Sequence, residues 1–263
     1  MTRLNLGVLF DPRFDILPPK ILLDEPGFVR VSSLNGKQPV RIPVEMTGEL
    51  AYLIGIIIGD GYVSRAAKRK SHGSGFYWKI VVTGPHDYLV RLRSMFFRNF
   101  GVHGGLVRDR RKENTWQLRF ANLVLHRFFT RVIGLPQGRK TTHGSWTRFE
   151  MVKGFPLYFL AGLMDSDGYV GKRYIGIVQK RFRFLVRVKR FANETLGLNF
   201  RGPSINRKLN GKVAGWIISI YKKEERTRLL CAIAQLEIGI KKADKRLYRK
   251  HRGLYGGPVA QYG

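Results

Sequence analysis

Residues 160–168 read LAGLMDSDG, and residues 53–61 read LIGIIIGDG. Each stretch ends an apolar run that begins with a helix-start signal. Thr47 can cap the first helix, and Pro156 suits the first turn of the second. Because both runs are apolar on every side, they predict two fully buried helices.

Small residues recur four positions apart in both runs, as Gly55 and Gly59 in the first and as Gly162 and Ser166 in the second. This spacing puts each pair on one helical face, where the lack of bulk lets two backbones approach closely. We therefore expect the two helices to pack on each other.

Both helices close on Asp-Gly, at Asp60-Gly61 and Asp167-Gly168. The glycines suit a left-handed cap, whereas the carboxylates are disfavoured at the negative end of a helix dipole. If the helices pair, the carboxylates meet and can recruit Mg²⁺, a metal that prefers oxygen ligands. Two such carboxylates beside a phosphodiester are typical of metal-dependent nucleases. The alternative is that each Asp-Gly is an ordinary helix-ending turn.

The same order of elements follows each motif: helix, two strands, helix, two strands, helix. Asp60 and Asp167 lie 107 residues apart, and residues 81–92 match residues 177–188 at an offset of 96. We predict an α+β fold of two pseudo-symmetric αββαββα repeats. The expected segments are an irregular N-terminal extension with a short strand at residues 28–32, a first repeat with its linker, a second repeat and a basic C-terminal tail. They span residues 1–46, 47–150, 151–245 and 246–263.

The 263 residues include 48 Lys and Arg against 18 Asp and Glu, for a net charge of +30. A polyanion, most simply nucleic acid, is the expected partner of such a chain. An anionic membrane is the competing partner, but the longest apolar runs fall short of the roughly 20 residues that span a bilayer.

The two motifs, their order and their spacing resemble the LAGLIDADG homing endonucleases, in the single-chain, two-motif branch that includes archaeal intron-encoded members. The resemblance implies a saddle of antiparallel sheets over DNA, with the motif helices at the centre. It also implies that Asp60 and Asp167 bind the catalytic metal, with Gly59 and Ser166 counted in the metal site. Two or three Mg²⁺ ions are expected, and Mn²⁺ or Ca²⁺ can substitute in binding.

The resemblance further implies a polar shell around the metals. Gln179 lies where a family glutamine often lies, and the offset of 96 makes Thr83 its counterpart. Lys140 and Lys242 lie where a family lysine approaches the cleavage centre, and Lys241 is the alternative to Lys242. The other interpretation is that these lysines are phosphate-binding surface charge.

The hairpins supply the candidates for DNA contact, because a two-stranded ribbon fits the major groove. In the first repeat they are Arg65, Lys68, Arg69, Lys79, Arg108, Arg110, Gln117 and Arg119. In the second repeat they are Lys172, Arg173, Tyr174, Asn206, Lys208, Asn210 and Lys212. Each can instead contact a phosphate or solvent, and no target sequence follows from them.

These features lead us to expect a monomeric, Mg²⁺-dependent endodeoxyribonuclease that cuts both strands of a long asymmetric site. By resemblance, it leaves short 3′ overhangs and promotes intron homing. The alternatives are an intron RNA maturase and a cleavage-deficient DNA-binding protein of the same fold. The expected location is the prokaryotic cytoplasm for an archaeal source and an organelle for a eukaryotic one.

Overall fold

The computed structural model describes residues 2–9, 20–32, 39–67, 76–109, 115–138, 146–207, 211–236 and 238. Its first repeat contains α1 (Gly48–Gly59), β4 (Gly61–Ala67), β5 (Phe76–Gly84), α2 (His86–Phe100), β6 (Gly105–Arg108), β7 (Trp116–Ala121) and α3 (Leu123–Arg127), which continues into the π-helical turn η3 (Phe128–Val132). Its second repeat contains α4 (Pro156–Asp167), β8 (Gly168–Val170), β9 (Ile175–Gln179), α5 (Phe182–Leu196), β10 (Arg201–Arg207), β11 (Val213–Ile220) and α6 (Lys223–Ala234).

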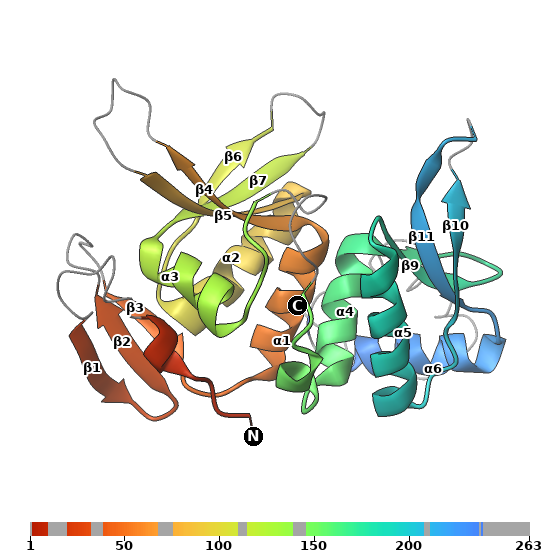
Figure 1. The fold of residues 1–263 in the computed structure, drawn as a ribbon, viewed down its shortest axis with the longest axis horizontal. Helices are drawn as coiled ribbons and strands as arrows, with labels where there is room; N and C mark the ends of the chain where they lie inside the picture. The colour runs from red at the N-terminus through yellow and green to blue at the C-terminus, as the bar shows by residue number, and fades with distance from the viewer. Residues whose placement is uncertain are drawn as a thin grey trace.

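The two repeats share one sheet topology. The first sheet has the order β4-β5-β7-β6, and the second, listed from its first strand, has the order β8-β9-β11-β10. All neighbouring strands in both sheets are antiparallel. The predicted α+β repeat is therefore confirmed, and Figure 1 shows the two sheets on either side of the pair α1 and α4.

The core is continuous through this helix pair. α1 is buried from Leu50 to Ile57, and α4 from Phe159 to Ser166. α2 and α3 pack on one face of the first sheet, and α5 packs on one face of the second. The other face of each sheet is therefore not covered by these helices.

The helix starts agree with the capping signals. The Leu50 N–H donates to Thr47 Oγ1 at 3.2 Å, and Pro156 occupies the first turn of α4. The predicted left-handed caps are wrong, because Gly168 is extended (φ −75°, ψ 154°) and Gly61 begins β4. At Gly61 a Cβ would lie 2.7 Å from the Ile57 Cα, so glycine lets the strand turn back against its own helix.

The N-terminal residues also differ from expectation. The strand expected at residues 28–32 is confirmed as β2 (Phe28–Ser32), but it is not alone: in the described residues η1 (Leu6–Leu9) precedes an antiparallel sheet of β1 (Lys20–Glu25), β2 and β3 (Val40–Pro43). Val31, Val40 and Ile42 are fully buried and join the core of the first repeat. The prolines of this segment obscured the short alternating strands in the sequence.

Within the described ranges, no helix combines the length and hydropathy that a membrane span would need.

Candidate active site and nucleic-acid interface

The centre of the site is the contact between α1 and α4. A Cβ on Gly55 would lie 2.5 Å from the Phe159 carbonyl oxygen, and one on Gly162 would lie 3.1 Å from the Gly55 Cα. Backbone therefore meets backbone at these glycines, and even one methyl group has no room. The predicted pairing of the motif helices is confirmed.

This pairing brings the two motif carboxylates to the same end of the helix pair. Asp60 caps the C-terminus of α1, and Asp167 is the last residue of α4. A Cβ on Gly59, the neighbour of Asp60, would lie 2.8 Å from Asp167 Oδ2. The negative ends of two helix dipoles thus carry two carboxylates, an arrangement that favours a bound cation.

A buried polar network ties the two motif helices to each other and to α2. The Tyr52 hydroxyl of α1 donates to Asp165 Oδ2 of α4 at 2.6 Å, and it lies 3.4 Å from the Tyr88 hydroxyl of α2. Burial raises the pKa of both tyrosines well above the ordinary value, and the nearby Asp165 charge raises it further. The tyrosines therefore stay protonated, and Tyr52 remains a donor to the buried carboxylate.

Gln179 orients one of the two motif carboxylates. Its side chain lies at the end of β9, and its Nε2 donates to Asp167 Oδ2. On the first-repeat side, the Thr83 backbone N–H donates to the Asp60 carbonyl at 3.2 Å. This bond fixes the backbone of Asp60, whereas Gln179 contacts the side chain of Asp167.

Strand register corrects the predicted counterpart of Gln179. Trp116 pairs with Gly84 across the first sheet, and Trp216 pairs with Gln179 across the second. Gly84, not Thr83, thus occupies the place of Gln179. One residue lies between β5 and α2, whereas two residues lie between β9 and α5. The offset of 96 residues therefore relates α2 to α5 but does not relate β5 to β9.

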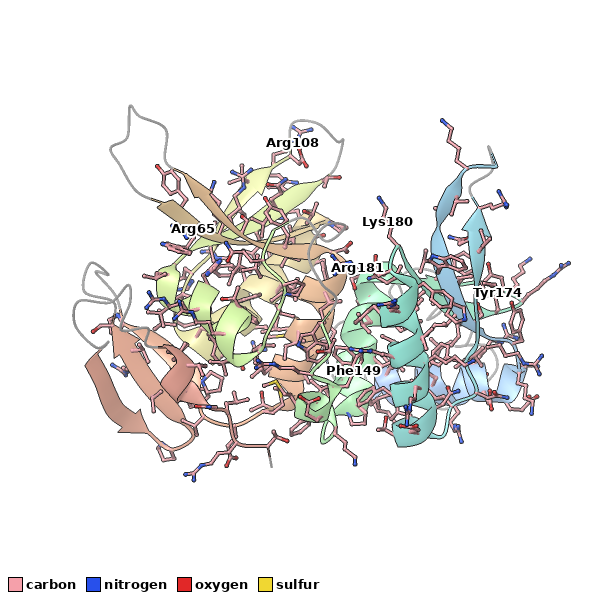
Figure 2. All side chains as sticks on the ribbon, viewed as in Figure 1. Arg65, Arg108, Phe149, Tyr174, Lys180 and Arg181 are labelled. Carbon is pink, nitrogen blue, oxygen red and sulfur yellow. The ribbon has the colours of Figure 1, made fainter. Side chains whose placement is uncertain are left out.

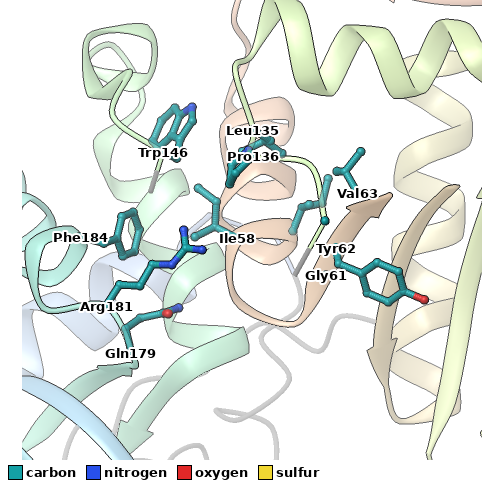
Figure 3. Close-up of a pocket in the computed structure, with 12 residues that line it drawn as sticks. Ile58, Gly61, Tyr62, Val63, Leu135, Pro136, Trp146, Gln179, Arg181 and Phe184 are labelled. Carbon is teal, nitrogen blue, oxygen red and sulfur yellow. The ribbon is translucent and has the colours of Figure 1, made fainter. Parts of the chain in front are cut away.

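A cleft beside the carboxylates lies between the two repeats and is lined by residues of both (Figure 3). Its lining includes Ile58 and Gly61 next to Asp60, and Gln179 and Arg181 from the second repeat. Figure 3 shows the Arg181 guanidinium reaching toward Ile58 across this cleft. Burial lowers the pKa of Arg181, so it carries a partly desolvated charge. Sequence reasoning missed Arg181, whose only signal was its place two residues after Gln179.

The donor set at this end fits a hard divalent cation. In the part of the chain that the structure describes, no three His, Cys, Asp or Glu side chains cluster as a metal site. Protein ligands would therefore be the carboxylates of Asp60 and Asp167 with nearby backbone oxygens, and Gly59 and Ser166 adjoin them. Mg²⁺ commonly takes one or two carboxylates and fills its other positions with water and substrate phosphate.

The first sheet divides the predicted DNA-contacting residues between its two faces. Figure 2 labels two of them, Arg65 and Arg108. Lys79, Gln117 and Arg119 lie on the face away from the helices, because Ile80, Leu118 and Phe120 between them enter the core. Arg65 pairs in register with Trp78 on the opposite face, and its guanidinium lies 5.0 Å from the Trp78 ring. Arg108 shares that face, since it pairs with Trp116.

The second sheet distributes its candidates along its rim. Lys172, Arg173 and Tyr174 lie in the exposed connection from β8 to β9, and the Tyr174 ring lies 5.1 Å from that of Tyr169. Asn206 lies near the end of β10, and Lys212 precedes β11. The remaining candidates lie outside the described residues: Lys68, Arg69, Arg110, Lys140, Lys208, Asn210 and Lys242.

No family model matches the chain. An uncharacterized protein of Methanocaldococcus jannaschii is 26% identical over 136 residues, which are 52% of this chain and 44% of that protein. The match thus spans less than half the length of this relative.

Solved structures give a broader match. I-DmoI in complex with DNA and Ca has 18% identity and a TM-score of 0.56, over 77% of this chain and 97% of that one. The LAGLIDADG homing endonuclease I-LtrWI bound to target DNA has 10% identity and a TM-score of 0.51, over 79% and 89%. The described geometry and these matches together show that the chain has the LAGLIDADG homing endonuclease fold, with both repeats on one polypeptide.

Proposed function

We propose that the chain is a metal-dependent, site-specific DNA endonuclease that acts as a monomer. The observation that carries this proposal is the glycine-lined contact of α1 and α4, which gathers Asp60 and Asp167 at one end. A carboxylate pair at helix C-termini has no structural benefit, since both charges oppose the helix dipoles. The fold supports the proposal, as do the DNA and Ca bound to I-DmoI.

Each residue near the centre has a role in this proposal. Asp60 and Asp167 hold the divalent ions, which when bound activate water and stabilise the leaving oxygen. Gln179 keeps the Asp167 carboxylate in place. Arg181 adds positive charge at the cleft for the phosphate backbone. Lys140 and Lys242, or Lys241, supply further charge near the cleaved phosphate.

The substrate is duplex DNA with a long, asymmetric site. The two sheets differ in length, since β4 and β5 have seven and nine residues where β8 and β9 have three and five. They therefore present different surfaces to the two half-sites. We further propose that cleavage leaves short 3′ overhangs and promotes homing of the encoding intron.

Cleavage of the intron-free host allele tests the proposal. The full chain with Mg²⁺ should make one double-strand break, whereas Asp60→Asn and Asp167→Asn should leave DNA affinity within about tenfold and eliminate cutting. Parallel loss of binding and cutting would contradict the assigned metal role. Binding without cutting by the wild-type chain would favour a DNA-binding protein, and Mg²⁺-dependent assistance of intron splicing would favour a maturase.

A further inference from the structure

A chain of side-chain hydrogen bonds crosses the open face of the first sheet. Arg119 donates to Gln117 Oε1 through Nε at 2.9 Å and through Nη2 at 2.7 Å. Gln117 in turn donates from Nε2 to Asp109 Oδ2 at 3.1 Å. The amide orientation follows from these partners, because a flipped amide would turn its NH₂ group toward the guanidinium.

This network engages both the carbonyl and the amide nitrogen of Gln117. Its carbonyl accepts from Arg119, and its amide donates to Asp109. Gln117 therefore serves as a brace and not as an independent base reader. The carboxylate of Asp109 is costly beside a polyanion, and its bond to Gln117 gives it a positioning role on this face.

Arg119 keeps its recognition edge. The two bonds to Gln117 use the side of the guanidinium that carries Nε, whereas the end formed by Nη1 and Nη2 points away from the brace. The side chain is exposed. Opposite it on β6 stands Gly105, where an added Cβ would meet nothing within 4 Å. The position opposite Arg119 on β6 therefore carries no side chain that would stand between it and a base.

The chemistry of this edge specifies its ligand. Two parallel N–H donors match the O6 and N7 acceptors that guanine presents in the major groove, and arginine is the commonest partner of that base. A guanidinium held in one orientation loses less rotamer freedom on binding than a free one. We propose that Arg119 reads a guanine in the half-site under the first repeat, and that Gln117 and Asp109 position it.

The register also indicates where this guanine lies. Gln117 pairs with Thr83, whose N–H bonds the Asp60 carbonyl. Arg119 is the next residue on the same face, one side-chain row of about 7 Å farther along β7. The recognised base therefore lies in the inner part of its half-site, close to the cleaved bonds. This inference rests on the proposed function.

Selection from a pool of random-sequence duplexes tests the inference without a known target. The full wild-type chain with Ca²⁺ should enrich a site that contains an inner guanine. Arg119→Ala should lose preference at that position alone, by about 5- to 150-fold against the other bases. Asp109→Ala should relax the same position by a smaller factor. Arg93→Ala, at an exposed position of α2, is the control and should enrich the wild-type site.

The outcomes distinguish failure of the proposed function from failure of the guanine assignment. If the wild-type chain enriches no sequence, the proposed function fails and the inference fails with it. If the wild-type chain enriches a site and Arg119→Ala enriches the same site unchanged, only the guanine assignment fails. An even loss of preference at every position would identify Arg119 as a phosphate contact and likewise overturn it. Thermal unfolding of each variant checks that the fold is retained.

Discussion

Replacement of Gly55 by alanine is predicted to separate the two motif helices. The new Cβ would lie 2.5 Å from the Phe159 carbonyl oxygen and 2.9 Å from the Leu163 nitrogen. Both are backbone atoms that cannot rotate away, so α1 must retreat from α4 by about 1 Å, a displacement large enough to cost roughly 100-fold in rate. Overpacking costs about 1–3 kcal/mol, against about 0.5–1 kcal/mol that alanine gains in a helix.

We therefore expect Gly55→Ala to lower the free energy of unfolding by about 1 kcal/mol, the middle of the difference between these two ranges, measured by urea denaturation. Single-turnover cleavage by saturating protein should fall by roughly 100-fold, with DNA affinity retained. Gly154→Ala is the matched control, because a Cβ there meets nothing within 4 Å. A Gly55→Ala variant as stable and as active as wild type would refute the close helix contact and its link to the carboxylates.

Three further predictions concern single side chains. Burial lowers the pKa of His126 to about 4, and neither ring nitrogen has a hydrogen-bond partner among the described residues. Its neutral form therefore contributes stability that is present above the unfolded pKa of 6.5 and is lost as pH falls toward 4. The loss is about 3 kcal/mol. Urea titrations across that window should show this loss of stability in the wild type and not in His126→Phe. The exposed His103→Gln is the control. An unchanged dependence of stability on pH in His126→Phe would contradict the prediction. Tyr52→Phe removes a donor to the buried Asp165 carboxylate and should cost about 1.5–3 kcal/mol in thermal unfolding, while equal stability would show that other groups suffice. Gln179→Ala should slow nicking of one DNA strand more than the other in strand-labelled cleavage, because Gly84 offers no equivalent contact on the first-repeat side; equal slowing of both would argue against asymmetric support.

Sequence patterns located most of the repeat correctly. Thr47 and Pro156 marked the starts of α1 and α4, and the helix expected to follow the motif of the second repeat is α5. The small residues four apart predicted which helices meet. These features depend on neighbours within a few turns of the chain, so the local sequence encodes them.

Strands β1 and β3 of the N-terminal sheet and the brace on the first sheet were not predictable in this way, whereas β2 was. β1 and β3 are short strands among prolines, and their pairing with β2 and the contact of β3 with α2 define them more than their own periodicity. Asp109 appeared in the sequence only as the first residue of a polar run. Its bond to Gln117 depends on the pairing of β6 with β7.

The amino-acid sequence alone determined the two acidic motifs, their repeated context, the order of helices and strands and the strongly basic charge. The folded molecule alone reveals that Gly84 occupies in the first sheet the position of Gln179 in the second, that Arg65 and Arg119 lie on different faces, and that Gln117 is engaged as a brace. The physical reason is that a one-residue change of strand register moves every side chain to the other face, and long-range pairing sets the register.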